Sequence, residues 1–145
     1  MGAYVGIDLG TTFSAISHID DTGRPTVLHS KEGQNITPSC VAIYDGEMHV
    51  GEQARKAWGI DDENVAARFK RDMGSTKTFK LDGNEFTPTT LSAAVLKKLK
   101  ADAEAQIGEI SEAVVTIPAN FSQEAREATM DAAKQAGLNV NYIIN

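Results

Sequence analysis

The sequence predicts an α/β protein, and three observations support this fold class. The first segments of the chain alternate apolar and polar residues and are joined by tight turns, which is typical of antiparallel strands. A long segment further along repeats apolar residues every four positions, as the buried face of a helix does. The last segments follow the order strand, helix, strand, which predicts a parallel crossover.

The N-terminal strands are expected at Tyr4–Leu9, Phe13–Ile19 and Thr26–His29. Gly10-Thr11-Thr12 joins the first two strands, and Asp20–Gly23 turns the chain into the third. Three consecutive strands with such short connections form an antiparallel meander.

The middle of the chain predicts several short elements. Two hairpins are expected, with turns at Asp45-Gly46 and Asp82-Gly83-Asn84. Short helices are expected at Gly51–Trp58 and Asn64–Arg71, and Trp58 is expected to pack its helix against the neighbouring core. The hairpin strands are Val41–Tyr44 with Met48–Val50, and Phe79–Leu81 with Glu85–Phe86.

A long helix is expected after Pro88, with Thr89 or Thr90 as its N-cap and Gly108 at its end. Its buried face is formed by the residues of the four-residue repeat: Leu91, Val95, Leu99, Ala103 and Ile107. The crossover then follows, with a strand at Ala113–Ile117 that Pro118 stops, a helix capped by Ser122 and closed by Gly137, and a strand at Val140–Ile144.

This order predicts two subdomains. Residues 1–33 and 111–145 are expected to form a core subdomain, and residues 34–110 are expected to be inserted into it. The last strand has no successor, so a dimer through this sheet edge is a further hypothesis.

Charge and composition restrict the partners. The formal net charge of −6 argues against nucleic acid or an anionic membrane surface as the main partner. Cys40 is the only cysteine and lies in an apolar run, which predicts a buried thiol and excludes an intrachain disulfide. No secretory signal and no apolar run of about 18 residues is present, so a cytoplasmic protein is expected.

The turn Gly10-Thr11-Thr12 is the first candidate for chemistry. Glycine lets backbone N–H groups approach an anion, and the two threonine hydroxyls are further donors to phosphate oxygens. Asp8, on the polar face of its strand, could hold Mg²⁺ through water. An ordinary hairpin with a polar turn explains the same residues, so the turn alone leaves both interpretations open. The P-loop and dinucleotide-binding glycine signatures are absent from the sequence.

Six segments, in order along the chain, resemble the Hsp70 family. The first is Val5–Ser14, which is similar to the first phosphate loop of that family. The others are Asn35–Ser39, Val50–Ala54, Lys70–Gly74, Leu96–Lys100, and the stretch from Ala113–Phe121 through Arg126 to Ala136–Leu138 and Ile143–Asn145. The resemblance covers essentially the whole chain.

The resemblance implies the actin-like ATPase (ribonuclease H-like) fold, with this chain as its first lobe carrying an inserted α+β subdomain. It also implies a role for each matching residue. Asp8 would arrange the Mg²⁺ shell, Gly10, Thr11 and Thr12 would contact the phosphates, and Lys70 would position the attacking water and the γ-phosphate. Pro118 and Arg126 would belong to an allosteric switch that reports the nucleotide state.

Local sequence alone gives three of these residues ordinary roles. Lys70 then belongs to a solvated Lys-Arg pair, Pro118 ends a strand, and Arg126 lies on a helix surface. The motif match favours the functional roles, because a lysine can neutralise charge that develops during phosphoryl transfer.

The family resemblance implies a stress-response chaperone that hydrolyses ATP to control binding and release of unfolded polypeptides. ATP or ADP with Mg²⁺ would be its cofactors, with K⁺ as a further candidate, and a J-domain co-chaperone and a nucleotide exchange factor its partners. The second lobe and the peptide-binding domain lie outside this sequence, so the chain alone is expected to hydrolyse ATP negligibly. The alternatives are an Hsp70-like nucleotide-binding scaffold without useful hydrolysis, and another actin-like ATPase.

Overall fold

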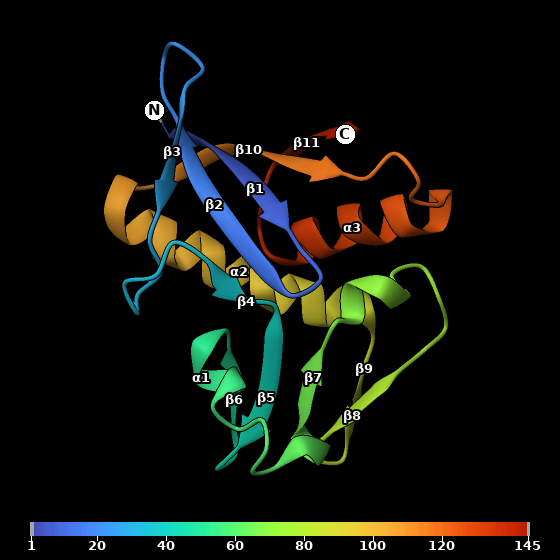
Figure 1. Cartoon of the computed structure of the whole chain (residues 1–145). Coiled ribbons are helices and arrows are strands. Elements are labelled where there is room, and N and C mark those ends of the chain that lie inside the picture. The colour runs from blue at the N-terminus through green and yellow to red at the C-terminus, as the bar shows by residue number, and fades with distance from the viewer. Residues whose placement is uncertain (1, 145) are drawn as a thin grey trace.

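A computed structural model describes residues 2–144, with side chains up to residue 141. Its largest sheet has six strands, which run in the order β11-β10-β1-β2-β3, with β4 also paired to β2 (Figure 1). Their bounds are β1 Ala3–Leu9, β2 Phe13–Ile19, β3 Pro25–Leu28, β4 Thr37–Pro38, β10 Ile110–Ile117 and β11 Val140–Ile144.

The predicted meander and crossover are both present in this sheet. β1 pairs antiparallel with β2, and β2 pairs antiparallel with β3. β1 also pairs in parallel with β10, which pairs in parallel with β11. Alternation along β1 places Val5, Ile7 and Leu9 in the core and leaves Asp8 exposed, as the period of a strand requires. The α/β fold class is confirmed.

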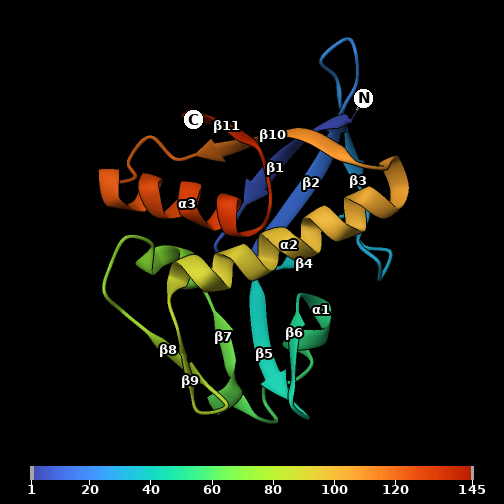
Figure 2. The same ribbon diagram turned by 180° about the vertical axis from the view of Figure 1, so that it is seen from behind.

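Two helices cover one face of the large sheet, and Figure 2 shows both in front of it: α2 (Pro88–Ile107) and α3 (Gln123–Gln135). The N-cap of α2 is Thr87, so the predicted cap at Thr89 or Thr90 is wrong. The Thr87 hydroxyl accepts from the Thr90 N–H at 3.1 Å, and the Thr90 hydroxyl accepts from the Thr87 N–H at 3.0 Å. Pro88 fits the first helical position because the N–H that it lacks would have no partner there.

The predicted end of α2 and the predicted N-cap of α3 are correct. Ser122 caps α3 by accepting from the Ala125 N–H at 3.0 Å, and Gly108 ends α2. No helix within residues 2–144 is both long enough and apolar enough to cross a bilayer.

The middle of the chain forms a three-stranded sheet, a hairpin and short helices. The sheet runs in the order β6-β5-β7 and the hairpin pairs β8 with β9. Their bounds are β5 Cys40–Tyr44, β6 Glu47–Val50, β7 Val65–Ala67, β8 Phe79–Leu81 and β9 Asn84–Phe86, with α1 at Glu52–Arg55 and 3₁₀ helices at Asp62–Asn64 and Phe69–Asp72.

The predicted helix Asn64–Arg71 is wrong. Val65 and Ala66 are buried by pairing with β5, so this segment begins as a strand. Arg68 then takes a left-handed conformation with φ 58°, which no α-helix can pass through. Tertiary pairing has therefore overridden a local helix pattern.

One hydrophobic core connects the two sheets. It joins Val5 and Ile7 of the large sheet, Val41 of the small sheet, and Val95 and Leu99 of α2, which lies between the sheets in Figure 2. The division into residues 1–33 with 111–145 and residues 34–110 stays a prediction, and the two parts share this core.

A partly buried ion cluster attaches the segment that follows β3 to helix α2. The Lys98 ammonium lies 2.9 Å from the Asp102 carboxylate and 3.1 Å from that of Glu32. Burial lowers the pKa of Lys98, but hydrogen bonds to Asp102 and Glu32 outweigh it and hold this pKa above its ordinary value. Gln106 adds a hydrogen bond to the His29 carbonyl at 2.7 Å.

Candidate phosphate-binding site

The turn between β1 and β2 has room only for glycine at position 10. A Cβ atom placed on Gly10 would lie 2.0 Å from the Phe13 carbonyl oxygen, far inside van der Waals contact. The turn therefore brings two stretches of backbone closer than any side chain would allow.

Two buried serines hold this turn in a closed ring of hydrogen bonds. The Gly10 N–H donates to the Ser14 hydroxyl at 3.2 Å, and Ser14 and Ser39 are 2.8 Å apart. The Ser39 hydroxyl donates to the Gly10 carbonyl at 2.8 Å, so Ser14 must donate to Ser39. Since the ring occupies the Gly10 N–H, Gly10 shapes the turn and is not itself a donor to an anion.

Thr11 and Thr12 keep their donors open. Within residues 2–144, their N–H groups and hydroxyls donate to no protein acceptor. The Thr12 carbonyl accepts from the Ser39 N–H at 2.9 Å, which fixes the far side of the turn. Adjacent unpaired N–H groups with two hydroxyls can receive phosphate oxygens.

Lys70 lies close to this turn, although 58 positions separate it from Thr12 in the sequence. It belongs to the 3₁₀ helix Phe69–Asp72, and its ammonium lies 5.5 Å from the centre of the Phe121 ring. Burial lowers the pKa of Lys70, and the charge of the Asp8 carboxylate opposes part of this shift. The ring of Phe121, in the loop before α3, and the carboxylate of Asp8, in β1, thus act on the ammonium from two different segments.

A cleft of about 440 Å³ brings three of the predicted residues together. Thr11, Lys70 and Pro118 line it, and Phe121 and the N-cap residue Ser122 complete one wall. Gly74 follows the cleft residue Met73 and packs closely on α3, because a Cβ there would lie 2.7 Å from the Ala125 backbone nitrogen in the first turn of this helix. Met73 and Gly74 therefore pack directly on the start of α3.

Arg126 does not line this cleft. Its guanidinium donates to the Ala119 carbonyl at 3.5 Å, which is a long hydrogen bond. It therefore contacts the backbone next to Pro118, rather than Lys70 or the threonines. This contact is compatible with a link between the Pro118 turn and α3.

The donor set fits a metal-bound polyphosphate. Mg²⁺ in proteins is commonly held by one or two carboxylates, by phosphate oxygens and by retained waters. Asp8 supplies one exposed carboxylate at the sheet surface. Thr11 and Lys70 supply a neutral and a positive donor in the cleft, and Thr12, outside the cleft lining, adds donors from the same turn.

Ser14, Ser39 and Phe121 are contributions that the sequence patterns did not identify. Ser14 and Ser39 are 25 positions apart, and no periodic signal connects them. Phe121 comes three residues after Pro118, and nothing in the local sequence distinguishes it from an ordinary apolar residue. Only their contacts in the fold reveal what they do.

The architecture and this cleft define a partial lobe of the actin-like ATPase class. The comparison with protein families agrees, because the family described as Hsp70 protein matches residues 4–145. The chain therefore belongs to the Hsp70 family. Members of this family are chaperones, and they generally bind ATP or ADP with Mg²⁺.

Proposed function

We propose that this chain forms the phosphate-binding wall of a cytoplasmic Hsp70 chaperone that hydrolyses ATP to control binding and release of unfolded polypeptides. The observation that carries the proposal is the cleft that joins Thr11, Lys70 and Pro118 from three separate segments. Co-chaperones of the J-domain and nucleotide-exchange classes would be partners of the complete protein.

Each side chain has a defined task in this proposal. Thr11 and Thr12 hold the β- and γ-phosphates through N–H and hydroxyl donors, and the serine ring keeps these donors in place. Asp8 orients water around Mg²⁺, which when bound neutralises charge on the phosphates. Lys70 stabilises charge that develops as water attacks the γ-phosphate in line. Most of the catalytic effect is positioning and charge stabilisation.

Pro118 and Arg126 are proposed to report the state of the nucleotide. Pro118 shares the cleft with Lys70, and Arg126 contacts the carbonyl of Ala119, the residue that follows Pro118. Proline has a fixed φ and no N–H, so it can act as a stiff element with two positions. A change at the γ-phosphate would then reach α3 through this turn.

The chain by itself supplies one wall of a nucleotide site, and we propose that alone it hydrolyses ATP negligibly. The test is calorimetry with Mg²⁺-ATP, together with steady-state turnover, on this chain and on a chain extended through a second lobe. Tight binding and turnover only in the extended chain support the proposal. Binding without turnover in the extended chain favours the scaffold alternative, and turnover by the short chain alone contradicts the proposal.

The proposed role of Lys70 is tested separately, by a substitution in the extended chain. Lys70→Ala is expected to lower turnover by about 100-fold, the effect of removing one preorganised charge-stabilising donor. Lys97→Ala removes the same charge from an exposed position on α2 and is the matched control. Equal effects of the two substitutions would mean that Lys70 has no special role.

A further inference from the structure

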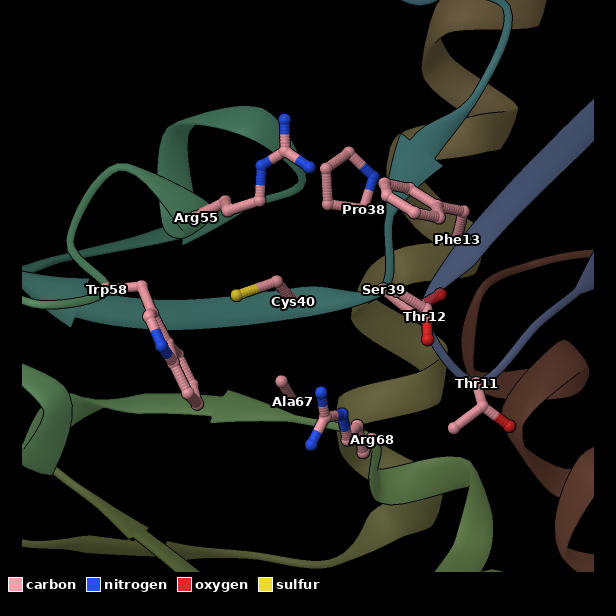
Figure 3. Close-up of a pocket in the computed structure, with 10 residues that line it drawn as sticks. All are labelled: Thr11, Thr12, Phe13, Pro38, Ser39, Cys40, Arg55, Trp58, Ala67 and Arg68. Carbon is pink, nitrogen blue, oxygen red and sulfur yellow. The ribbon is translucent and has the colours of Figure 1, made fainter.

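A second pocket, of about 190 Å³, adjoins the turn between β1 and β2 (Figure 3). Thr11 and Thr12 line it, as do residues of β4, β5, β7 and the α1 region, but Lys70 and Pro118 do not. Thr11 lines both this pocket and the phosphate-binding cleft, so the two meet at the turn and differ in their other walls. The proposed function assigns no ligand to it.

Aromatic rings stand at both ends of this pocket. Figure 3 shows Trp58 at one end and Phe13 at the other, with Cys40 between them. Trp58 is 55% exposed, so the prediction that it packs into a core is wrong. The Arg55 guanidinium lies 5.6 Å from the centre of the Phe13 ring and supports that wall. An exposed indole at the edge of an apolar pocket is a surface on which a planar ring can stack.

A cation also lines the pocket: Arg68 is an exposed residue with an unusual backbone conformation. Arg68 has φ 58°, a left-handed conformation that is rare for residues other than glycine. Figure 3 shows its guanidinium on the side of Cys40 opposite Arg55. Arg55 is paired with Glu52 at 3.0 Å, whereas Arg68 forms no salt bridge with any residue that the structure describes. An arginine at the edge of an apolar pocket can bind a planar carboxylate with two parallel hydrogen bonds.

The floor of the pocket carries no negative charge that would repel an anion. Cys40 is 5% exposed, and burial raises the pKa of its thiol to about 11, although Arg55 acts in the opposite direction. The thiol is therefore neutral and unreactive at physiological pH. No carboxylate is among the described residues that line the pocket.

The volume selects a small ligand. An engineered cavity of about 150 Å³ is known to hold benzene, so 190 Å³ accommodates one aromatic ring with one small substituent. We propose that this pocket binds a single-ring aromatic carboxylate, with its ring against Trp58 and its carboxylate on Arg68. This proposal does not rest on the proposed ATPase activity, although the pocket shares the Thr11-Thr12 turn with the proposed phosphate site.

The chain offers a direct probe of this site, because Trp58 is its only tryptophan. Its indole N–H gives a single side-chain signal in a proton–nitrogen correlation NMR spectrum. Benzoate is expected to shift this signal in a saturable way, with a dissociation constant on the order of 1 mM for so small a ligand. Benzamide has the same ring and no charge, and it should bind about fivefold more weakly.

Variants separate the charge from the shape of the pocket. Arg68→Gln should weaken benzoate binding about fivefold and remove the preference over benzamide. Arg24→Gln is the matched control, because Arg24 is an exposed arginine in the turn at the opposite end of β2. Ala67→Leu fills the pocket and should abolish binding of both compounds, while the other signals of the spectrum confirm that the variant is folded.

Three results would overturn the proposal. The first is the absence of a saturable shift at Trp58, and the second is equal binding of benzoate and benzamide. The third is benzoate binding that Arg68→Gln leaves unchanged. Lys70→Ala should leave benzoate binding intact, so this proposal and the nucleotide proposal can fail separately.

Discussion

Removal of the Ser39 hydroxyl tests the hydrogen-bonded ring beneath the phosphate-binding turn. In Ser39→Ala, the Ser14 hydroxyl loses its acceptor and the Gly10 carbonyl loses its donor, at contacts of 2.8 Å each, while Ser14 still accepts from the Gly10 N–H. Ser14 is 1% exposed and Ser39 is 3% exposed, so water cannot replace the missing hydroxyl without local opening. A buried polar group without a partner costs about 1–3 kcal/mol. Because Gly10 is only partly buried, we expect a total loss of about 2–3 kcal/mol.

The assay is urea unfolding followed by circular dichroism, with thermal unfolding as a second measurement. A loss of this size should lower the Tm by about 6–10 °C in a domain of this length. Ser75→Ala is the matched control, because the Ser75 hydroxyl also makes two hydrogen bonds, to the Asp72 carbonyl and from the Lys77 N–H, but at an exposed position where water can replace it. The control should change the free energy of unfolding by less than about 1 kcal/mol.

A double-mutant cycle makes the test sharper. If Ser14 and Ser39 share one ring, Ser14→Ala and Ser39→Ala should be less destabilising together than the sum of the two single changes, with a coupling of about 1 kcal/mol. The reasoning fails if Ser39→Ala is no more destabilising than the control, or if the two changes are strictly additive.

Three further predictions concern packing, ionisation and assembly. Gly74→Ala should destabilise the chain by more than about 2 kcal/mol, because its Cβ would meet the backbone of α3. Gly59 has a similar φ of 88°, and a Cβ there would have nothing within 4 Å, so Gly59→Ala should lower the free energy of unfolding in urea by only about 1 kcal/mol. Equal losses for the two variants would refute the contact between position 74 and α3. Burial raises the pKa of Glu32, but the hydrogen bond from Lys98 and the charge of Lys98 outweigh burial and hold this pKa below the ordinary 4.5. The Glu32–Lys98 pair therefore stabilises the fold above pH 4.5, and this stabilisation is lost as the pH falls through the lowered pKa. Lys98→Met should flatten this acid dependence of the free energy of unfolding, and an unchanged slope would argue against the ion pair. Strand β11 lies at the edge of the large sheet, so copies should pair through it at high concentration, and a constant monomer mass in sedimentation equilibrium would remove this prediction.

Local patterns predicted most of the large sheet and both long helices. Alternation in β1 and β2, the four-residue repeat in α2 and the Ser122 cap of α3 are short-range signals, and each is present in the structure. Such signals work where the burial of one face depends mainly on the residues of that element.

The same reasoning failed where neighbours decided the outcome. Val65–Ala67 became a strand because β5 was there to pair with it. Trp58 became exposed because α1 ends at Arg55 and the following turn carries the indole out to the mouth of a pocket. Neither partner can be identified from the sequence around these residues.

For the candidate site, the sequence by itself determined the donors: a glycine turn with two threonines, a carboxylate two residues before it, and a lysine far along the chain. The tertiary structure decided which of them meet. It placed Lys70 beside Thr11 and Pro118, left Arg126 on the Ala119 carbonyl, and used the Gly10 N–H within the serine ring. The physical reason is that side-chain type follows directly from the sequence. Proximity between residues many positions apart depends on how the sheets and helices pack around a shared core.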